Sequence, residues 1–291
     1  MSETVKNYIQ LTKPTIMLLV ILTGSTALIV EGSLLGKPLE FFLVLLGLYL
    51  TGGAANALNQ YFERNIDAQM TRTRKRRPLP QHKINPNKAL IFSITIGVTG
   101  VLIFILFFNW LTALLALATV LFYSIFYTIF LKPNTSQNIV IGGIAGAMAP
   151  VGAWTAATGR MELFPWLLFL IVFLWTPPHF WALALFYQED YRRTKLPMMP
   201  VVAGEDSTLR QIMRYTLVLV LTSFTLILFK NGLIYLFIAF IMGGGFIRKS
   251  FIANKYRTEK NFKGLFGYSI IYLFTIFIMI IVDKVFYQIV F

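Results

Sequence analysis

Long stretches without Asp, Glu, Lys or Arg dominate the chain and predict its secondary structure. Eight such stretches cover residues 15–30, 41–62, 89–131, 133–159, 163–188, 215–229, 231–247 and 264–282. A helix needs about 20 mostly apolar residues to cross a bilayer, because hydrocarbon cannot satisfy unpaired backbone groups. The pattern therefore predicts transmembrane helices, and the two shortest runs, 215–229 and 231–247, must borrow flanking residues to span.

The stretch 89–131 is too long for one crossing. As a single helix its 43 residues would extend about 65 Å, roughly twice the hydrocarbon core. We expect it to turn back at Asn109–Trp110, which makes nine helices in all. The predicted fold is an all-α integral membrane protein, in which residues 1–291 form a single polytopic domain of nine transmembrane helices in one bundle.

Lys and Arg predict the orientation of this bundle. With the N-terminus in the cytoplasm, 22 of the 26 Lys and Arg fall on the cytoplasmic side. Such an excess marks cytoplasmic loops, so it supports the nine-helix count and puts the C-terminus outside. The net charge of +14 then lies almost wholly on one face, where it attracts anionic lipid headgroups of the bilayer. Because no segment remains for a soluble domain, nucleic acid is not an expected partner.

Composition narrows the class further. Apolar residues make up 57% of the chain and charged residues 13%, about half the charged share of a soluble domain. With no cysteine and two histidines, disulfide frameworks, thiolate metal sites and cysteine-linked haem are excluded. The first apolar run is full length, has no convincing small-residue cleavage site and follows no long Arg- and Ser-rich segment. We therefore expect an uncleaved N-terminus and a bacterial plasma (inner) membrane location.

Acidic residues are scarce, which makes their grouping informative. Six of the twelve lie in two cytoplasmic loops that also hold half of the basic residues, and the others, Asp283 among them, are expected in tails and outer loops. If the second helix continues through the first group, Asn59, Glu63 and Asp67 share one face. Two carboxylates and an amide suit Mg²⁺, and the arginines that follow, Arg72 and Arg77, suit phosphate. The pattern indicates a metal–diphosphate site, whereas the plainer interpretation is a helix end with ordinary rim charges.

The second acidic group follows the sixth helix. Pro177 and Pro178 are expected to open or kink that helix in mid-membrane, and the freed carbonyls need partners. His179 is then either a buried imidazole bonded to such a carbonyl or a functional group. Asp190, about three turns later, reaches the same rim as Asp67 if the second and sixth helices are neighbours; otherwise it belongs to a solvated charge run.

Two features of the fourth and fifth helices complete the sequence-based picture. Lys132 is the only charge in its loop, so it either points back at the rim or merely marks that loop as cytoplasmic. The small residues of 142–147 predict close helix packing, and they also leave room for a bulky ligand.

These segments together resemble the intramembrane aromatic prenyltransferase (UbiA-type) superfamily, and within it the haem-farnesylating branch (protohaem IX farnesyltransferases, or haem O synthases). The resemblance covers nearly the whole chain. It is carried by Leu11–Pro14, Asn59 with Glu63 and Asp67, Met70–Pro78, Asn138–Gly143, Trp175–Trp181, Asp190–Tyr191 and Leu196–Pro200. Glu63 stands where the family usually has Asp, Asn65 where Asp is frequent, and His82 where we expect Gly. The family's second Asp-x3-Asp is incomplete, since residue 186 is Phe, so the ligands of a second metal ion stay open.

The resemblance implies an activity and a role for each candidate residue. Farnesyl diphosphate would bind at the cytoplasmic rim with its tail in the bundle, and a vinyl group of haem b, a substrate and not a cofactor, would attack the allylic cation. The implied Mg²⁺ ligands and catalytic residues are Asn59, Glu63, Asp67 and Asp190. The implied substrate contacts are Arg72, Arg77, Lys132, Arg193, His179 for haem, and Tyr191. Haem A synthase and terminal oxidase assembly are the implied protein partners.

Three other interpretations stay open from the sequence. A quinone-pathway aromatic prenyltransferase would use the same site with another acceptor, although the segment around His179 argues against it. A secondary transporter would also have broken helices and polar groups in mid-membrane, but no inverted repeat is visible. A haem-binding chaperone would need no Mg²⁺.

Overall fold

The computed structural model describes residues 2–229 and 232–290, with side chains as far as residue 286, and its long elements are all helical. Nine segments of this part of the chain are long and apolar enough to cross a membrane, as predicted. They are α2 (Pro14–Glu31), α3 (Pro38–Gln69), α5 (Pro86–Phe107), α6 (Trp110–Leu121) with η1 (Phe122–Leu131) and α7 (Lys132–Asn134), α8 (Asn138–Ala147) with α9 (Ala149–Thr158), α10 (Leu163–Phe186), α13 (Gly204–Phe224) with η2 (Thr225–Phe229), α14 (Leu233–Tyr256) and α15 (Glu259–Val290). α1 (Glu3–Leu11) precedes the first of these segments, and three further short helices lie between them: α4 (Thr71–Arg74), α11 (Gln188–Arg193) and α12 (Met199–Val202).

The turn predicted inside the long apolar stretch is confirmed. α5 ends at Phe107 and α6 begins at Trp110, with Asn109 as its N-cap. The side-chain Oδ1 of Asn109 accepts from the Thr112 N–H at 2.9 Å, and its side-chain Nδ2 donates to the backbone carbonyl of Thr155 at 2.8 Å. Asn109 thus satisfies a free N–H at the helix start and ties the hinge to α9.

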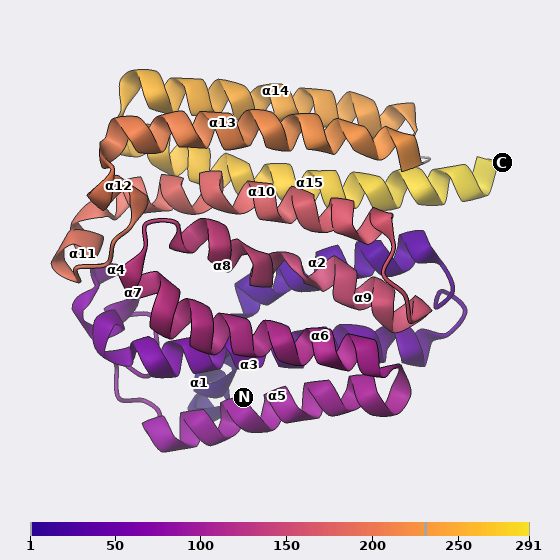
Figure 1. Ribbon diagram of the computed structural model, residues 1–291, viewed down its shortest axis with the longest axis horizontal. Coiled ribbons are helices and arrows are strands. Elements are labelled where there is room, and N and C mark those ends of the chain that lie inside the picture. The colour runs from indigo at the N-terminus through magenta and orange to yellow at the C-terminus, as the bar shows by residue number, and fades with distance from the viewer. Residues whose placement is uncertain (1, 230–231, 291) are drawn as a thin grey trace.

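The helices pack as a ring with additions on two sides. α2 contacts α3 and α9, α10 contacts α8 and α15, and α15 returns to contact α2, which closes the ring. α5 lies outside α3 at one edge, and α13 and α14 lie at the other (Figure 1). α4, α7, α11 and α12 gather at one end of the long helices, while the C-terminus lies at the opposite end (Figure 1). Polar loops are thereby concentrated at one end of an apolar bundle.

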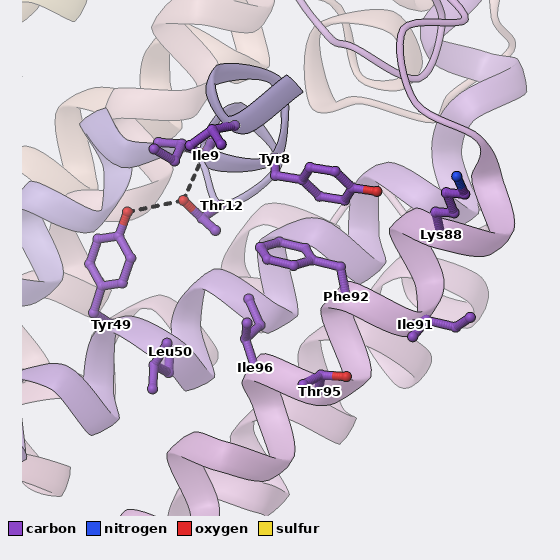
Figure 2. Close-up of a pocket in the computed structure, with 11 residues that line it drawn as sticks. Tyr8, Ile9, Thr12, Tyr49, Leu50, Lys88, Ile91, Phe92, Thr95 and Ile96 are labelled. Atoms are coloured by element: carbon purple, nitrogen blue, oxygen red, sulfur yellow. Dashed lines mark hydrogen bonds between the residues drawn. The ribbon is translucent and has the colours of Figure 1, made fainter. Parts of the chain in front are cut away.

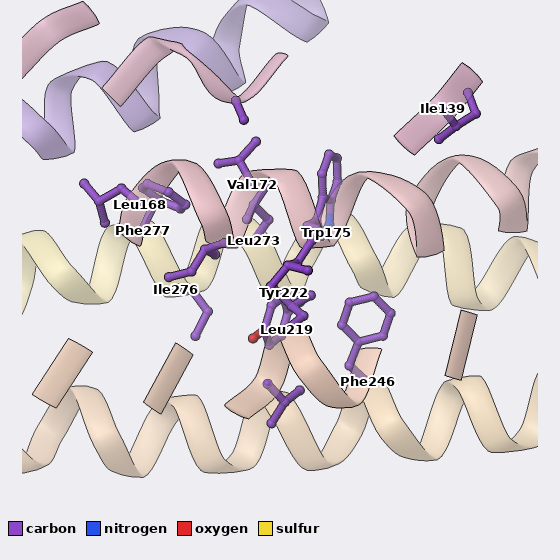
Figure 3. Close-up of a cluster of buried hydrophobic side chains, with 14 of the residues drawn as sticks. Ile139, Leu168, Val172, Trp175, Leu219, Phe246, Tyr272, Leu273, Ile276 and Phe277 are labelled. Carbon is purple, nitrogen blue, oxygen red and sulfur yellow. The ribbon is translucent and has the colours of Figure 1, made fainter. Parts of the chain in front are cut away.

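A large cluster of buried apolar side chains includes the contact between α10 and α15. Leu168 and Val172 of α10 meet Tyr272, Ile276 and their neighbours on α15, and Leu219 of α13 and Phe246 of α14 belong to the same cluster (Figure 3). The prolines of residues 177–178 lie inside α10, which continues to Phe186. The opening predicted there is therefore not a break in the helix.

Asp283 does not lie in an outer loop, as the apolar run had suggested. It is buried within α15 and accepts hydrogen bonds from the backbone N–H groups of Gly232 and, at 3.4 Å, Tyr235. These groups begin α14, where a helix leaves N–H groups without partners inside the helix. The buried carboxylate of Asp283 therefore caps the start of α14.

α1 packs against α3 and α5. The Gln60 side chain of α3 donates to the carbonyl of Leu11 at 2.9 Å, and the rings of Tyr8 and Phe92 are 5.0 Å apart. A mostly apolar groove of about 680 Å³ remains between α1, α3 and α5, as Figure 2 shows. The α1–α2 junction at its edge is therefore anchored to the bundle.

Candidate active site

The face of α3 predicted to carry the chemistry is buried. α3 continues to Gln69, as the prediction required, so Asn59, Glu63 and Asp67 follow one another along one side of the helix. Their exposed fractions are 2%, 3% and 2%. Buried carboxylates need compensating partners, because an isolated charge in a low-dielectric interior is very costly. The identity of these partners decides what the site can do.

The π-helical segment η1 and the short helix α7 that follows it supply partners for the first two positions. Lys132 forms an ion pair with Glu63, and the side-chain amide of Asn59 donates to Thr128 Oγ1 at 3.2 Å. The two partners are four residues apart, as are the two residues on α3, so two parallel contacts join the segments. Thr128 Oγ1 also donates to the carbonyl of Tyr123, five residues earlier, at 2.8 Å. Five residues is the π-helical hydrogen-bond step, a geometry frequent at functional sites.

Arg77 brings both carboxylates to one point. Its Nη1 forms an ion pair with Asp67 and lies 3.5 Å from Glu63 Oε2. The turn after α3 places it there, since the Thr73 hydroxyl donates to the Asp67 carbonyl at 2.9 Å and the Arg77 N–H donates to the Thr73 carbonyl at 3.0 Å. Burial alone lowers the pKa of Arg77, but Asp67 and Glu63 outweigh burial and raise that pKa above its ordinary value. One cationic nitrogen thus lies within reach of both carboxylates.

Asp190 reaches the same rim by a different route from the one predicted. The second and sixth spanning helices are not close neighbours, since α10 packs mainly on α8, α13 and α15 and α3 mainly on α5. Contact is made by α11, which follows α10. Asp190 accepts hydrogen bonds from the backbone N–H of Arg72 at 3.0 Å and from the Arg193 guanidinium at 2.6 Å. Because α4 follows α3 directly, the two predicted acidic regions meet at one end of the bundle.

The surroundings of Asp190 favour its ionised form, and the neighbouring Arg72 keeps one N–H donor without a partner among the described residues. Burial acts first to raise the pKa of Asp190, but hydrogen bonds from Arg72, Thr71 and Arg193 hold that pKa below its ordinary value. The Arg72 guanidinium lies over the Tyr187 ring, 5.9 Å from its centroid, and its buried Nε has no hydrogen-bond partner among the described residues. A buried donor without a partner is costly, so Arg72 has hydrogen-bonding capacity to offer an anion.

His179 lies away from this acid–base cluster. It is buried at the α10–α15 interface, where its Nδ1 and Ser269 Oγ are 2.7 Å apart. The rings of Trp175 and Phe266 stack on the imidazole at centroid distances of 4.1 and 4.5 Å. The partner is thus a hydroxyl and not the proline-freed carbonyl considered from the sequence. Tyr191 is also buried, and the substrate contacts assigned to both residues stay predictions.

Neighbouring side chains fill most of the small-residue face of α8. The Tyr127 ring packs directly on Gly142, and the Thr176 side chain lies 3.1 Å from the position that a Cβ would take at Gly143. Only Gly146 of the three glycines has open space beside it. Close packing is therefore the main role of this run, as predicted, and room for a ligand is confined to one position.

Lys13 is the site residue that sequence reasoning missed. It was counted among the positive charges of the N-terminal tail, yet its Nζ donates to Asn59 Oδ1 at 2.9 Å. Burial, and next the charge of Arg77, lower the pKa of Lys13 well below its ordinary value. The available signal was its position immediately before Pro14, which begins the first spanning helix and holds this lysine at the rim.

The geometry described above can be compared with known proteins. The sequence profile of the UbiA prenyltransferase family matches residues 17–277. The chain belongs to the UbiA prenyltransferase family.

Curated relatives of this UbiA-family chain match it over nearly its full length. The protoheme IX farnesyltransferase of Gloeothece citriformis is 41% identical over 285 residues, which cover 97% of this chain and 88% of that protein. The protein of the same name from Symbiobacterium thermophilum is 44% identical over 287 residues, covering 97% and 95%. The resemblance inferred from the motifs is thereby confirmed.

A solved structure shares the fold of this UbiA-family chain. The UbiA homologue of Archaeoglobus fulgidus, bound to GPP and Mg²⁺, superposes with a TM-score of 0.62 over 94% of this chain and 99% of that one. The two sequences are 13% identical, so this likeness concerns the arrangement of the helices.

Proposed function

We propose that this chain is a haem O synthase, which transfers the farnesyl group of farnesyl diphosphate to a vinyl group of haem b. The observation that carries this proposal is the convergence of buried carboxylates and cations at one end of an apolar bundle. The acids suit a metal ion, the cations suit a diphosphate, and the bundle suits an isoprenoid tail. The names of the relatives at 41–44% identity support haem as the acceptor.

The donor set of α3 fits Mg²⁺. Mg²⁺ is commonly held by one or two carboxylates together with substrate phosphates. Glu63 and Asp67 already share one cationic nitrogen of Arg77, so both can reach a single cation. We assign Mg²⁺ to these two carboxylates, with the Asn59 amide oxygen as a further ligand. The described residues do not group Asp190 with the two carboxylates, and Asp190 is proposed as an additional ligand. Bound there, the ion would stabilise the negative charge that develops on the leaving diphosphate.

The basic residues of the site would bind the diphosphate oxygens. Arg77 and Lys132 now pair with Asp67 and Glu63, Arg193 pairs with Asp190, and the guanidinium of Arg72 has a free donor. Cations fixed in a buried site stabilise developing negative charge more strongly than they would in water. These side chains therefore lower the barrier to breaking the allylic C–O bond, whose electron pair leaves with the diphosphate.

The electrons and atoms of the transfer balance without a redox partner. The π electrons of the haem vinyl group form the new bond to the farnesyl carbon, and water then adds to the resulting cation and loses a proton. The products are diphosphate and a haem that carries a hydroxyethylfarnesyl group. His179 and Tyr191 are the proposed haem and substrate contacts.

The distribution of Lys and Arg supports a proposal for where the protein lies and which side of the membrane its site faces. The acid–base cluster lies on the side of the bundle that holds most of the Lys and Arg, so we place it at the cytoplasmic surface of a bacterial plasma membrane. The N-terminus would lie on the same side and the C-terminus outside, and residues 1–291 would act as one catalytic domain. Haem A synthase and terminal oxidase assembly remain the proposed protein partners.

A product assay tests the proposed function. Purified protein is incubated with haem b, farnesyl diphosphate and Mg²⁺, and the porphyrins are analysed by mass spectrometry. We expect a porphyrin with the mass of the hydroxyethylfarnesyl product, absent when Mg²⁺ is chelated. A hydroxybenzoate-type acceptor in a parallel reaction tests the quinone-pathway alternative. No haem product from folded protein, with the benzoate prenylated instead, would overturn haem as the acceptor.

A further inference from the structure

The backbone at the α1–α2 junction holds Lys13 in an unfavourable conformation. Lys13 has φ 54° and ψ 67°, in the left-handed region, which is sterically unfavourable for a residue other than glycine. Its N–H donates to the carbonyl of Gln10 at 3.2 Å, and its carbonyl accepts from Ile16 at 2.9 Å. Such conformations persist only where the surroundings enforce them, and they cluster at functional sites.

The residue before Lys13 anchors that conformation. The Thr12 hydroxyl donates to the carbonyl of Ile9 at 2.8 Å and lies 3.1 Å from the hydroxyl of Tyr49 on α3 (Figure 2). Thr12 itself is buried. The chain is therefore fixed to α3 immediately before the lysine, and the Lys13 side chain extends to Asn59, ten residues beyond Tyr49 on the same helix.

Charge distinguishes Lys13 from the cations next to it. Arg77 and Lys132 each have a carboxylate partner, whereas Lys13 has only the neutral amide of Asn59 and no ion-pair partner among the described residues. Lys13 nevertheless interacts electrostatically with both of these cations and with Glu63. Three cations thus share two carboxylates, Glu63 and Asp67. A buried ammonium without an anion is costly, and an anionic ligand would compensate it.

We propose that Lys13 binds an anionic oxygen of the diphosphate and is a further substrate-binding cation of this site, contributed by the segment before the first spanning helix. This inference rests on the proposed function, because it takes the diphosphate as the ligand of the cluster. It adds that the α1–α2 junction forms part of the site and does not serve only to set the topology.

Binding of inorganic diphosphate tests this assignment apart from turnover. The full chain in detergent is titrated calorimetrically with inorganic diphosphate in the presence of Mg²⁺. A hydrogen bond to a charged group is strong enough that Lys13→Met should weaken binding about 10- to 100-fold. Lys13→Arg should restore most of it. Lys6→Met, which removes an exposed cation of the same segment, should bind like wild type.

Thermal unfolding of the same variants separates binding from folding. Lys13→Gly accepts the left-handed backbone without a steric penalty, so it should unfold no lower than wild type and still bind diphosphate as weakly as Lys13→Met. In turnover, the KM for farnesyl diphosphate should rise in Lys13→Met while that for haem stays unchanged. Lys13→Gly remains a usable test should Lys13→Met fail to fold.

The outcomes distinguish this inference from the proposed function. If Lys13→Met and Lys13→Gly bind diphosphate as tightly as wild type while Arg72→Met binds it more weakly, the role of Lys13 is overturned and the proposed function stands. If the Lys13 variants bind diphosphate more weakly but wild type forms no haem product, the role of Lys13 is supported and haem b is overturned as the acceptor. If wild type binds no diphosphate but still forms the haem product, the role of Lys13 is overturned and the function stands. If wild type neither binds diphosphate nor forms the haem product, both are overturned.

Discussion

Neutralising Glu63 offers the sharpest test of how the site is held together. Glu63→Gln keeps the size of the side chain and removes the charge that pairs with Lys132 and Arg77, in a position where the Glu63 side chain is only 4% exposed. Removing one partner of a buried ion pair costs about 3–5 kcal/mol, because the remaining charge stays buried without compensation. At roughly 2–4 °C per kcal/mol, the unfolding temperature should fall by about 6–20 °C.

A matched substitution lies on the same end of the molecule. Glu189 pairs with Arg192 at 2.7 Å, but its side chain is 84% exposed, and exposed pairs contribute about 0–1 kcal/mol. Glu189→Gln should therefore unfold within about 4 °C of wild type. Unfolding in detergent is followed by tryptophan fluorescence, and kcat/KM is measured on the same preparations. We expect turnover to fall at least about 100-fold in Glu63→Gln, the effect of losing a charge-stabilising group, and to remain unchanged in Glu189→Gln.

A double variant separates the stability effect from the catalytic one. Glu63→Gln combined with Lys132→Met removes the uncompensated lysine, so part of the lost stability should return. Activity should stay low, because both residues belong to the proposed site. Equal unfolding temperatures for Glu63→Gln and Glu189→Gln, or a double variant less stable than the sum of the two single changes, would refute the argument that burial makes this pair essential.

Five further substitutions have defined outcomes. Asp67→Asn should leave a folded protein with little or no transferase activity, and near-normal turnover would exclude Asp67 as a metal ligand. His179→Ala should weaken haem binding more than farnesyl diphosphate binding, and an unchanged haem titration in detergent would contradict its assigned contact. His82 has φ 57°, so His82→Gly should raise the unfolding temperature by about 1–2 °C, a gain of roughly 0.5 kcal/mol; a lower temperature would refute the strain. Gly142→Ala should cost about 1–3 kcal/mol by overpacking while Gly146→Ala stays neutral, and equal unfolding curves would contradict the described packing.

The features that could be predicted from the sequence are those that depend on residues close together along the chain. Nine spans follow from charge-free runs, and the shared face of Asn59, Glu63 and Asp67 follows from their four-residue spacing once α3 continues to Gln69. The left-handed backbone at His82, where we expected Gly, explains why that position favours glycine. In each case the local pattern and the tertiary structure agree.

The features that the sequence did not predict depend on pairs far apart along the chain. Lys13 and Asn59 are 46 residues apart, and Arg72 and Asp190 are 118 apart. No periodicity connects such pairs. Lys13 was therefore counted as a topological charge. Asp283 was placed outside the bundle because its apolar run ends one residue earlier, while its actual partners are the N–H groups that begin α14.

The contact between α2 and α15 has a consequence for biosynthesis. α15 closes the ring against α2, so the first span inserted into the membrane reaches its final neighbour only after the last span has left the ribosome. The part of the acid–base cluster that lies in residues 13–132 is made in the first half of synthesis, and Asp190, Arg193 and the helices that close the ring follow in the second half. Loss of the last span would therefore remove the contacts of α15 with both α2 and α10 and leave the ring of helices open.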